Sequence, residues 1–62
     1  MKYYYNNELV SASEAKSIIT SECIRQWKDN QREEYGSWED QTPEVQNEYF
    51  ESLWNELIEE RG

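Results

Sequence analysis

The N-terminal segment has the pattern of a β-hairpin. Two short runs rich in β-favouring side chains, residues 3–5 and 8–10, flank the pair Asn6-Asn7. Asparagine tolerates the positive φ angles that a two-residue type I′ turn requires. We therefore expect a hairpin over about residues 2–10, and because a lone hairpin is unstable in water, one of its faces should lie on helices. The expected register pairs Tyr3 with Val10, Tyr4 with Leu9 and Tyr5 with Glu8.

The chain after the hairpin has the periodicity of a long helix. Ser11 and Glu14 have the spacing of a capping box, and neither glycine nor proline occurs before Gly36. These signals predict a helix over about residues 12–35. One apolar stripe recurs at the helical period and predicts the buried face: Ala12, Ala15, Ile19, Cys23 and Trp27, with Ile24 at the margin. The opposite side carries three basic residues, which we call the basic ridge: Arg25, Lys28 and Arg32.

A second helix is predicted over about residues 43–60. Gly36 suits a left-handed cap after the first helix, Thr42 suits an N-cap and Pro43 suits a first helical turn. The large apolar side chains of the segment are Val45, Tyr49, Phe50, Leu53, Trp54, Leu57 and Ile58. Their stripe covers more than half of the helix circumference, which is wider than one helix and one hairpin are expected to cover. We therefore expect part of it to remain accessible to a partner.

Together these elements predict a mostly helical α+β protein, in which a short N-terminal β-hairpin packs on two antiparallel α-helices in the order ββαα. A chain of 62 residues forms one domain at most, here residues 1–62, and buries only about 60% of the surface of its unfolded form. Cys23 is the only cysteine and histidine is absent, so the sequence predicts neither an internal disulfide nor a structural zinc site with about four ligands. We expect no cofactor and no metal, which leaves a partner chain as the expected source of extra stability.

The net charge of −8 is concentrated in the second half of the chain. Residues 1–32 contain five basic and four acidic residues, whereas residues 33–62 contain ten acidic residues and one arginine. One side of the second predicted helix is acidic without a basic residue: Glu44, Glu48, Glu51, Asn55 and Glu59, with Glu56 and Glu60 on its shoulder. Like charges three or four positions apart destabilise a helix by roughly 0.2 to 0.5 kcal/mol per pair. Two interpretations stay open: charge that keeps a small protein soluble, or a row of carboxylates that binds a basic surface.

The composition argues against an enzyme. No histidine is available for acid–base chemistry, and Cys23 lies on the apolar stripe, away from any helix N-terminus that would activate a thiol. A domain this small also has little room for a pocket of the roughly 300 Å³ or more that ligand sites occupy. Alternation of Asp29, Gln31 and Glu33 is similar to a calcium loop, but Glu34 stands where an EF-hand requires glycine.

The charge also limits the expected partners. Phosphate contacts supply most of the affinity for nucleic acids, so a short basic ridge on a protein of charge −8 predicts no direct nucleic-acid binding. The same charge disfavours an anionic membrane surface, and no apolar run reaches the roughly 20 residues that span a bilayer. With one thiol and no apolar leader segment, the protein is expected in the cytoplasm, which is that of the host cell if the protein is viral.

The favoured hypothesis is that the acidic side of the second helix binds a larger protein with a basic surface, such as a nuclease or another nucleic-acid-binding protein. Glu48 and Glu51 lie about 6 Å and about 10.5 Å from Glu44 along a helix axis, a spacing similar to that of phosphates along a DNA strand. Tryptophan is a frequent anchor residue of interfaces. The expected partner-binding residues are Trp38, Glu39, Asp40, Glu44, Glu48, Glu51, Trp54, Glu56 and Glu59.

In size, charge and plan, the chain is similar to the small acidic inhibitors that bacteriophages and mobile elements make against restriction or CRISPR nucleases and other DNA-handling proteins. The resemblance implies an anti-restriction or anti-CRISPR-like protein that blocks a nucleic-acid-binding surface stoichiometrically, without turnover; DNA mimicry is one version of this idea. The alternative is a homodimeric structural or regulatory subunit that docks through the apolar margin of the second helix, at Trp54 and Ile58.

Overall fold

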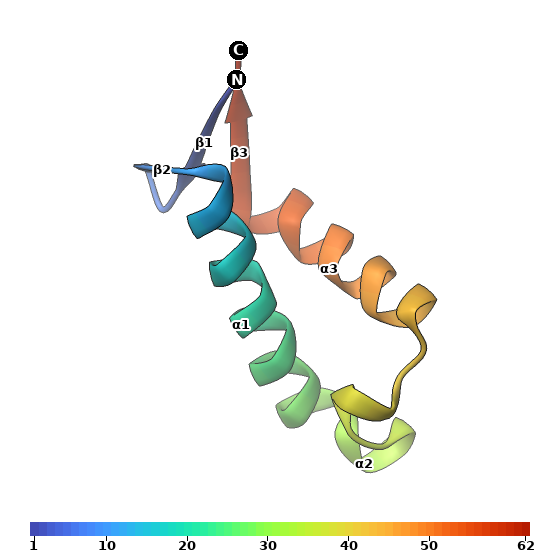
Figure 1. Ribbon diagram of the computed structural model, residues 1–62. Helices are drawn as coiled ribbons and strands as arrows, with labels where there is room; N and C mark the ends of the chain where they lie inside the picture. The colour runs from blue at the N-terminus through green and yellow to red at the C-terminus, as the bar shows by residue number, and fades with distance from the viewer.

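The chain forms an α+β structure in which a three-stranded antiparallel sheet holds both chain ends (Figure 1). The computed structural model describes residues 1–62. The strands are β1 (Lys2–Tyr5), β2 (Glu8–Val10) and β3 (Ile58–Arg61), in the order β2-β1-β3. β1 is therefore the central strand, and its two neighbours come from opposite ends of the sequence.

The predicted hairpin is confirmed, including its register. Tyr3 pairs with Val10, Tyr4 with Leu9 and Tyr5 with Glu8. Asn6 and Asn7 have φ angles of 51° and 67°, which are the positive values that a type I′ turn needs at both central positions. Because side chains alternate along a strand, Tyr3 and Tyr5 pack against the core while Tyr4 lies on the other face of the sheet.

The prediction that the second helix continues to residue 60 is wrong. α3 (Pro43–Leu57) ends at Leu57, and Ile58–Arg61 forms β3, which pairs antiparallel with β1 so that Tyr5 lies opposite Ile58. The free edge of β1 gives the last residues backbone partners that outweigh their local helical preference. The strand also places β-branched Ile58 in the core, where it is 6% exposed. The chain thus ends in a third strand after its helices, so the expected ββαα arrangement is only partly correct.

The single helix predicted over residues 12–35 is divided at Gln31. α1 (Ala12–Asn30) is followed by a one-turn helix, α2 (Arg32–Tyr35), and then by η1 (Trp38–Asp40), a short 3₁₀ helix. Gln31 has a φ of −119°, well away from the regular helical value of about −63°.

The break at Gln31 allows the buried indole of Trp27 to find a hydrogen-bond acceptor. Its N–H donates to the carbonyl of Gly36 at 2.8 Å. In a continuous helix these two residues would lie about 13.5 Å apart along the axis. Gly36 itself has a φ of 88° and caps α2, where its N–H donates to the carbonyl of Arg32, so the prediction that the helical segment ends at this glycine is confirmed. Its ψ of −174° lies outside the left-handed helical region, so the predicted left-handed cap is wrong.

Both helix starts have the predicted caps. The backbone N–H of Glu14 donates to Ser11 Oγ at 3.1 Å, at the start of α1. The N–H of Val45 donates to Thr42 Oγ1 at 3.4 Å, and Pro43 occupies the first turn of α3. These contacts satisfy N–H groups that have no partner inside the helix.

The core lies where α1, α3 and the sheet meet. Four members of the predicted α1 stripe are buried: Ala15, Ile19, Cys23 and Trp27. Leu53 of α3 and Ile58 of β3 complete the buried set, whereas Ala12, expected on the stripe, is exposed because it lies at the first residue of the helix. α1 leads away from the sheet and α3 returns to it (Figure 1). None of the helices is both long and apolar enough to cross a membrane.

Candidate functional site

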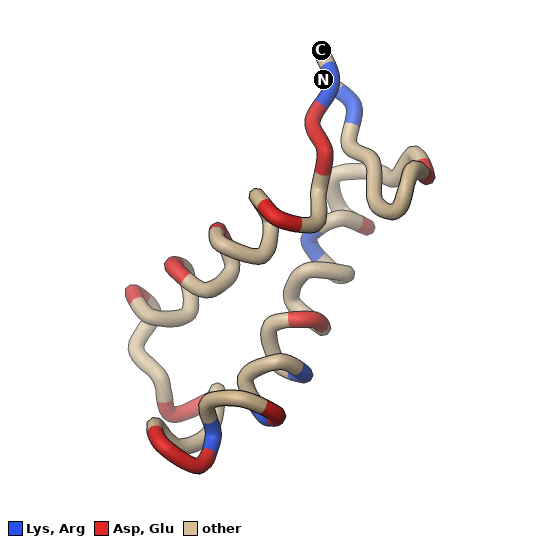
Figure 2. Tube along the Cα trace, turned by 180° about the vertical axis from the view of Figure 1, so that it is seen from behind, with Lys and Arg blue, Asp and Glu red and all other residues tan.

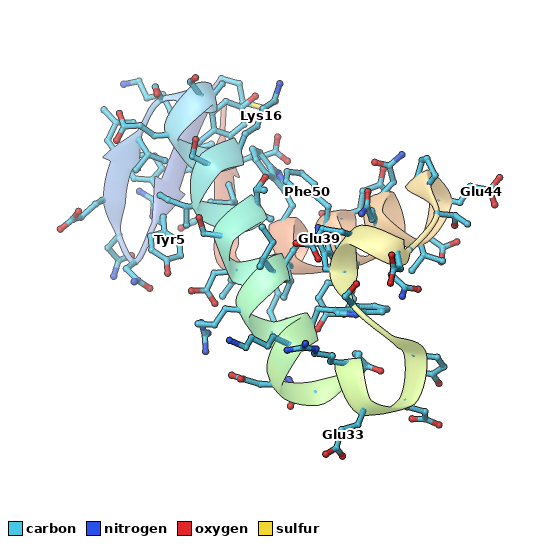
Figure 3. All side chains as sticks on the ribbon, turned by 60° about the horizontal axis from the view of Figure 1, so that its bottom comes forward. Tyr5, Lys16, Glu33, Glu39, Glu44 and Phe50 are labelled. Carbon is cyan, nitrogen blue, oxygen red and sulfur yellow. The ribbon has the colours of Figure 1, made fainter.

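Three of the predicted binding residues form an exposed row on α3, which we call the acidic row: Glu44, Glu48 and Glu51. Figure 2 shows acidic positions recurring along α3 with no basic position between them. The ion pairs of the molecule join Arg25 to Glu22 and Asp29, and Arg61 to Glu59, so none involves the row. Figure 3 shows Glu44 pointing away from the body of the protein. The row is therefore an array of solvated carboxylates that a cationic surface can approach.

The basic ridge does not neutralise this row. Arg25 donates a hydrogen bond to Glu22 on the same helix, and that contact lowers the pKa of the Glu22 carboxyl and raises the pKa of Arg25. Lys28 and Arg32 form no ion pair. The basic ridge, which the break at Gln31 divides between α1 and α2, thus remains a surface separate from the acidic row of α3.

Trp54 lies beside the acidic row and is half-buried. Its ring meets the Tyr3 ring edge-on with centroids 5.5 Å apart, and it stacks with Phe50 at 5.9 Å. Its remaining surface lines an open groove of about 490 Å³, which we call the Trp54 groove, together with Lys16, Phe50, Glu51, Asn55 and Glu60. The expectation that the protein has little room for a hollow above roughly 300 Å³ is therefore wrong for its surface. The groove lies between α1, α3 and β3 and adjoins the acidic row through Glu51.

Ile58 and Glu59 do not take the positions expected for them. Ile58, predicted to remain accessible on the margin of a helix, is buried in the core. Glu59, predicted on the acidic side of that helix, lies in β3 and accepts two hydrogen bonds from Arg61, at 3.0 and 2.8 Å. These contacts lower the pKa of the Glu59 carboxyl. Arg61 also lies over the ring of Tyr4, with 4.2 Å between its guanidinium carbon and the ring centroid.

Glu56 is exposed near the end of α3 but lies apart from the acidic row. It lines a hollow with Tyr4, Glu59 and the turn residues Asn6 and Asn7. At the helical period of about 3.6 residues, Glu56 lies roughly a third of a turn away from the Glu44 direction. The structure therefore divides the expected carboxylates between two regions.

The residues of η1 lie at the other end of α3. Trp38 is half-buried, with its ring 5.6 Å from the Trp27 ring and 5.8 Å from the Tyr49 ring, centroid to centroid. Its carbonyl accepts a 2.9 Å hydrogen bond from Gln46, which joins η1 to α3. Glu39 and Asp40 are exposed, and Asp40 accepts a hydrogen bond from Ser37. Trp38 is thus largely used to pack the protein's own fold.

The sequence pattern did not identify Lys16 and Glu60 as neighbours of Trp54. Glu60 reaches the groove only because β3 pairs with β1, which sets Glu60 opposite Tyr3. Tyr3 touches Trp54, so the strand pairing carries the Glu60 carboxylate to the same place. No local signal in the sequence marks this pairing, since residues 58–61 contain neither a turn residue nor a run of β-favouring side chains.

The one thiol of the protein is not activated. Burial raises the pKa of the Cys23 thiol, and the nearby Glu22 charge adds to the effect. A protonated thiol inside the core is a poor nucleophile. No group of three or more histidine, cysteine or acidic side chains converges in a way that could hold a metal ion. The arrangement suits binding of cationic groups.

No family model, curated protein or solved structure matches the chain.

Proposed function

We propose that this protein is a non-enzymatic binding module that docks its acidic row on a basic surface of a larger protein, in the manner of a stoichiometric inhibitor. The single observation that carries the proposal is the exposed row Glu44, Glu48 and Glu51, which has no internal counter-ion although six basic residues are present in the chain. Each carboxylate remains available for a cation of the partner.

The fixed spacing of the row supports a target that ordinarily binds nucleic acid. The three carboxylates are held on one rigid helix and span about 10.5 Å along its axis. A protein that neutralises phosphates with lysine and arginine presents cations at comparable intervals. Long-range attraction would steer the two proteins together, and the partner's nucleic-acid site would then be blocked. Anti-restriction and anti-CRISPR proteins are examples of this type of action, in the cytoplasm of the cell.

The dimeric alternative has less support. It relied on Trp54 and Ile58 together as an apolar margin, and Ile58 is part of the core. Trp54 alone leaves a small apolar surface bordered by Glu51 and Glu60. Two copies of a molecule with a net charge of −8 also repel each other.

The test combines capture of partners with two variants of equal charge. The row variant carries Glu44→Gln, Glu48→Gln and Glu51→Gln; the control carries Glu8→Gln, Glu33→Gln and Glu34→Gln, three exposed carboxylates elsewhere. Proteins captured from bacterial lysates by the wild type are identified by mass spectrometry, purified and titrated with all three proteins.

The expected partner has a basic nucleic-acid-binding surface, and a DNA duplex competes with this protein for it. We expect the row variant to fold normally and to bind about ten-fold more weakly or worse, because several charge pairs are lost at once. The control should change affinity much less. Equal affinity of the row variant and the wild type, or a complex that DNA does not displace, would contradict the proposal.

A further inference from the structure

The Trp54 groove combines an aromatic wall with a polar rim. Phe50 and Trp54 stack with an interplanar angle of 27°, and Tyr3 supports Trp54 edge-on at 74°. Because Trp54 is held from two sides, little side-chain freedom is left to lose when a ligand covers its open surface. Such a preformed aromatic surface is typical of an anchor site at an interface.

The rim of the groove carries two carboxylates that form no ion pair within the chain. Glu51 comes from α3 and Glu60 from β3, and neither forms an ion pair. Asn55 adds an amide to the lining. Strand alternation produces this rim: Glu60 lies on the same face of β3 as Ile58, whereas Glu59 lies on the opposite face with Arg61.

We propose that the Trp54 groove receives an arginine side chain of the partner protein, which stacks on Trp54 while its guanidinium meets Glu51 and Glu60. This inference rests on the proposed function and names the chemistry of its anchor. A guanidinium is planar and weakly hydrated, so it can lie on an aromatic face and donate to a carboxylate at the same time. The ammonium of lysine is compact and strongly hydrated, and it satisfies only one of these demands well.

The protein contains one example of the same chemistry on the other face of its sheet. Arg61 lies over the Tyr4 ring and donates two hydrogen bonds to Glu59. There an aromatic ring and a carboxylate hold an arginine of the same chain. The Trp54 groove offers a larger aromatic surface and two carboxylates without an arginine of the chain, which makes it complementary to an arginine from outside.

Lys16 is the one cation among the residues that line the groove. Its substitution therefore tests whether the affinity for a cation rises, as the proposal requires, or falls. Lys16 forms no ion pair with Glu51 or Glu60. Its charge opposes the entry of a second cation. Removing that charge should therefore strengthen binding, which is the opposite of what loss of a contact residue does. Lys16 and Phe50 can be followed in Figure 3.

The experiment titrates the full-length protein with an oligo-arginine peptide and an oligo-lysine peptide of equal length. Affinity is measured by calorimetry, and the indole N–H resonance of Trp54 is followed by NMR. The wild type should bind the arginine peptide about five-fold more tightly than the lysine peptide, with a shift of the Trp54 resonance. Trp54→Leu, which keeps an apolar side chain, should abolish the preference. Glu60→Gln, on the exposed rim, should reduce it and serves if Trp54→Leu unfolds.

Lys16→Gln should tighten binding of the arginine peptide by about two-fold or more, since exposed charge pairs have effects of this size. Lys28→Gln is the matched control, because it removes the same charge from another part of α1. A smaller effect of Lys28→Gln supports a local role of Lys16, and an equal effect contradicts it.

Failure of the groove and failure of the proposed function give different results. The proposal that the Trp54 groove binds arginine is overturned if the two peptides bind with equal affinity. It is also overturned if the arginine preference survives both Trp54→Leu and Glu60→Gln. The row can still be tested by Glu44→Gln with Glu48→Gln, which lie outside the groove. If that double variant binds both peptides with the affinity of the wild type, the proposed binding role of the acidic row is overturned, even where the arginine preference holds.

Discussion

The indole N–H of Trp27 donates to the carbonyl of Gly36, and this bond joins the end of α1 to the connection that leads to α3. Trp27 is buried, and its ring also meets those of Tyr35, Trp38 and Tyr49. The Trp27 side chain therefore contacts both Gly36 and η1, the segment that leads from α2 to α3. The orientation of α3, and with it the direction of the acidic row, depends on this contact.

Trp27→Phe should lower the free energy of unfolding by about 1 to 3 kcal/mol, because the partly buried hydrogen bond to Gly36 loses its donor and the smaller ring gives up part of the aromatic packing. Urea denaturation followed by circular dichroism measures the change. Trp38→Phe is the control, since the Trp38 indole forms no hydrogen bond in the structure and should cost less. Equal losses in the two variants would mean that packing alone matters here.

Leu53→Ala should cost about 2 to 5 kcal/mol, which is enough to unfold most of so small a domain. Leu53 is 5% exposed and is the buried residue of α3. Leu9→Ala removes the same atoms from a residue that is 61% exposed and should cost less than about 0.5 kcal/mol. Thermal and urea unfolding compare the two variants, and a near-neutral Leu53→Ala would place α3 in a different orientation.

Ile58→Ala tests the strand at the C-terminal end. Alanine has a higher helix propensity than isoleucine. If residue 58 continued α3 on an accessible surface, the substitution would therefore leave the free energy of unfolding unchanged or raise it. In the observed strand it removes buried volume and should cost about 2 kcal/mol or more. Ile24→Ala, at a position 42% exposed, is the comparison. Amide exchange of Tyr4 should also become faster, because its N–H faces β3, whereas the N–H groups of Tyr3 and Tyr5 face β2.

Two of the three ion pairs, Arg25 with Glu22 and Arg61 with Glu59, predict a pH dependence with a defined sign. A hydrogen bond from Arg25, and after it one from Gln26, lower the pKa of the Glu22 carboxyl below its ordinary value of 4.5. A carboxyl with a lowered pKa in the folded state stabilises the fold above about pH 4.5, and this contribution disappears as the pH falls through the lowered value. The same sign applies to Glu59 with Arg61.

NMR titration of the side-chain carboxyls should therefore find both midpoints below 4.5. Arg25→Gln should raise the midpoint of Glu22 and leave that of Glu59 in place, and Arg61→Gln should do the reverse. Each variant is the control for the other. A common shift of both carboxyls would indicate a general effect of net charge in place of the two specific contacts.

The parts of the fold that depend on neighbouring residues could be predicted from the sequence. Asn6 and Asn7 determine the turn and hence the register of β1 with β2. The spacing of Ala15, Ile19, Cys23 and Trp27 identified the buried side of α1, and Ser11 and Thr42 identified two helix starts. In each case the controlling interaction joins residues close in the chain.

The parts that depend on distant pairing could not be predicted. Ile58 continues the apolar periodicity of α3, so a local pattern extends the helix through it, but β1 lies far away in sequence and supplies the partner that makes β3 a strand. This difference moves Glu59 to the outer face and brings Glu60 to Trp54. The acidic row itself was predictable, because Glu44, Glu48 and Glu51 share one helix.

The central position of β1 has a consequence for how the chain folds. β2 follows β1 directly in the sequence, whereas β3 is separated from β1 by both long helices. One edge of the hairpin therefore has no strand partner until residues 58–61 reach it. Closing the sheet requires contacts between residues far apart in the chain, which slows folding relative to a bundle of local contacts. The native sheet can be completed only when α1 and α3 bring residues 58–61 back to β1, so closure of the sheet is expected to be a late step of folding.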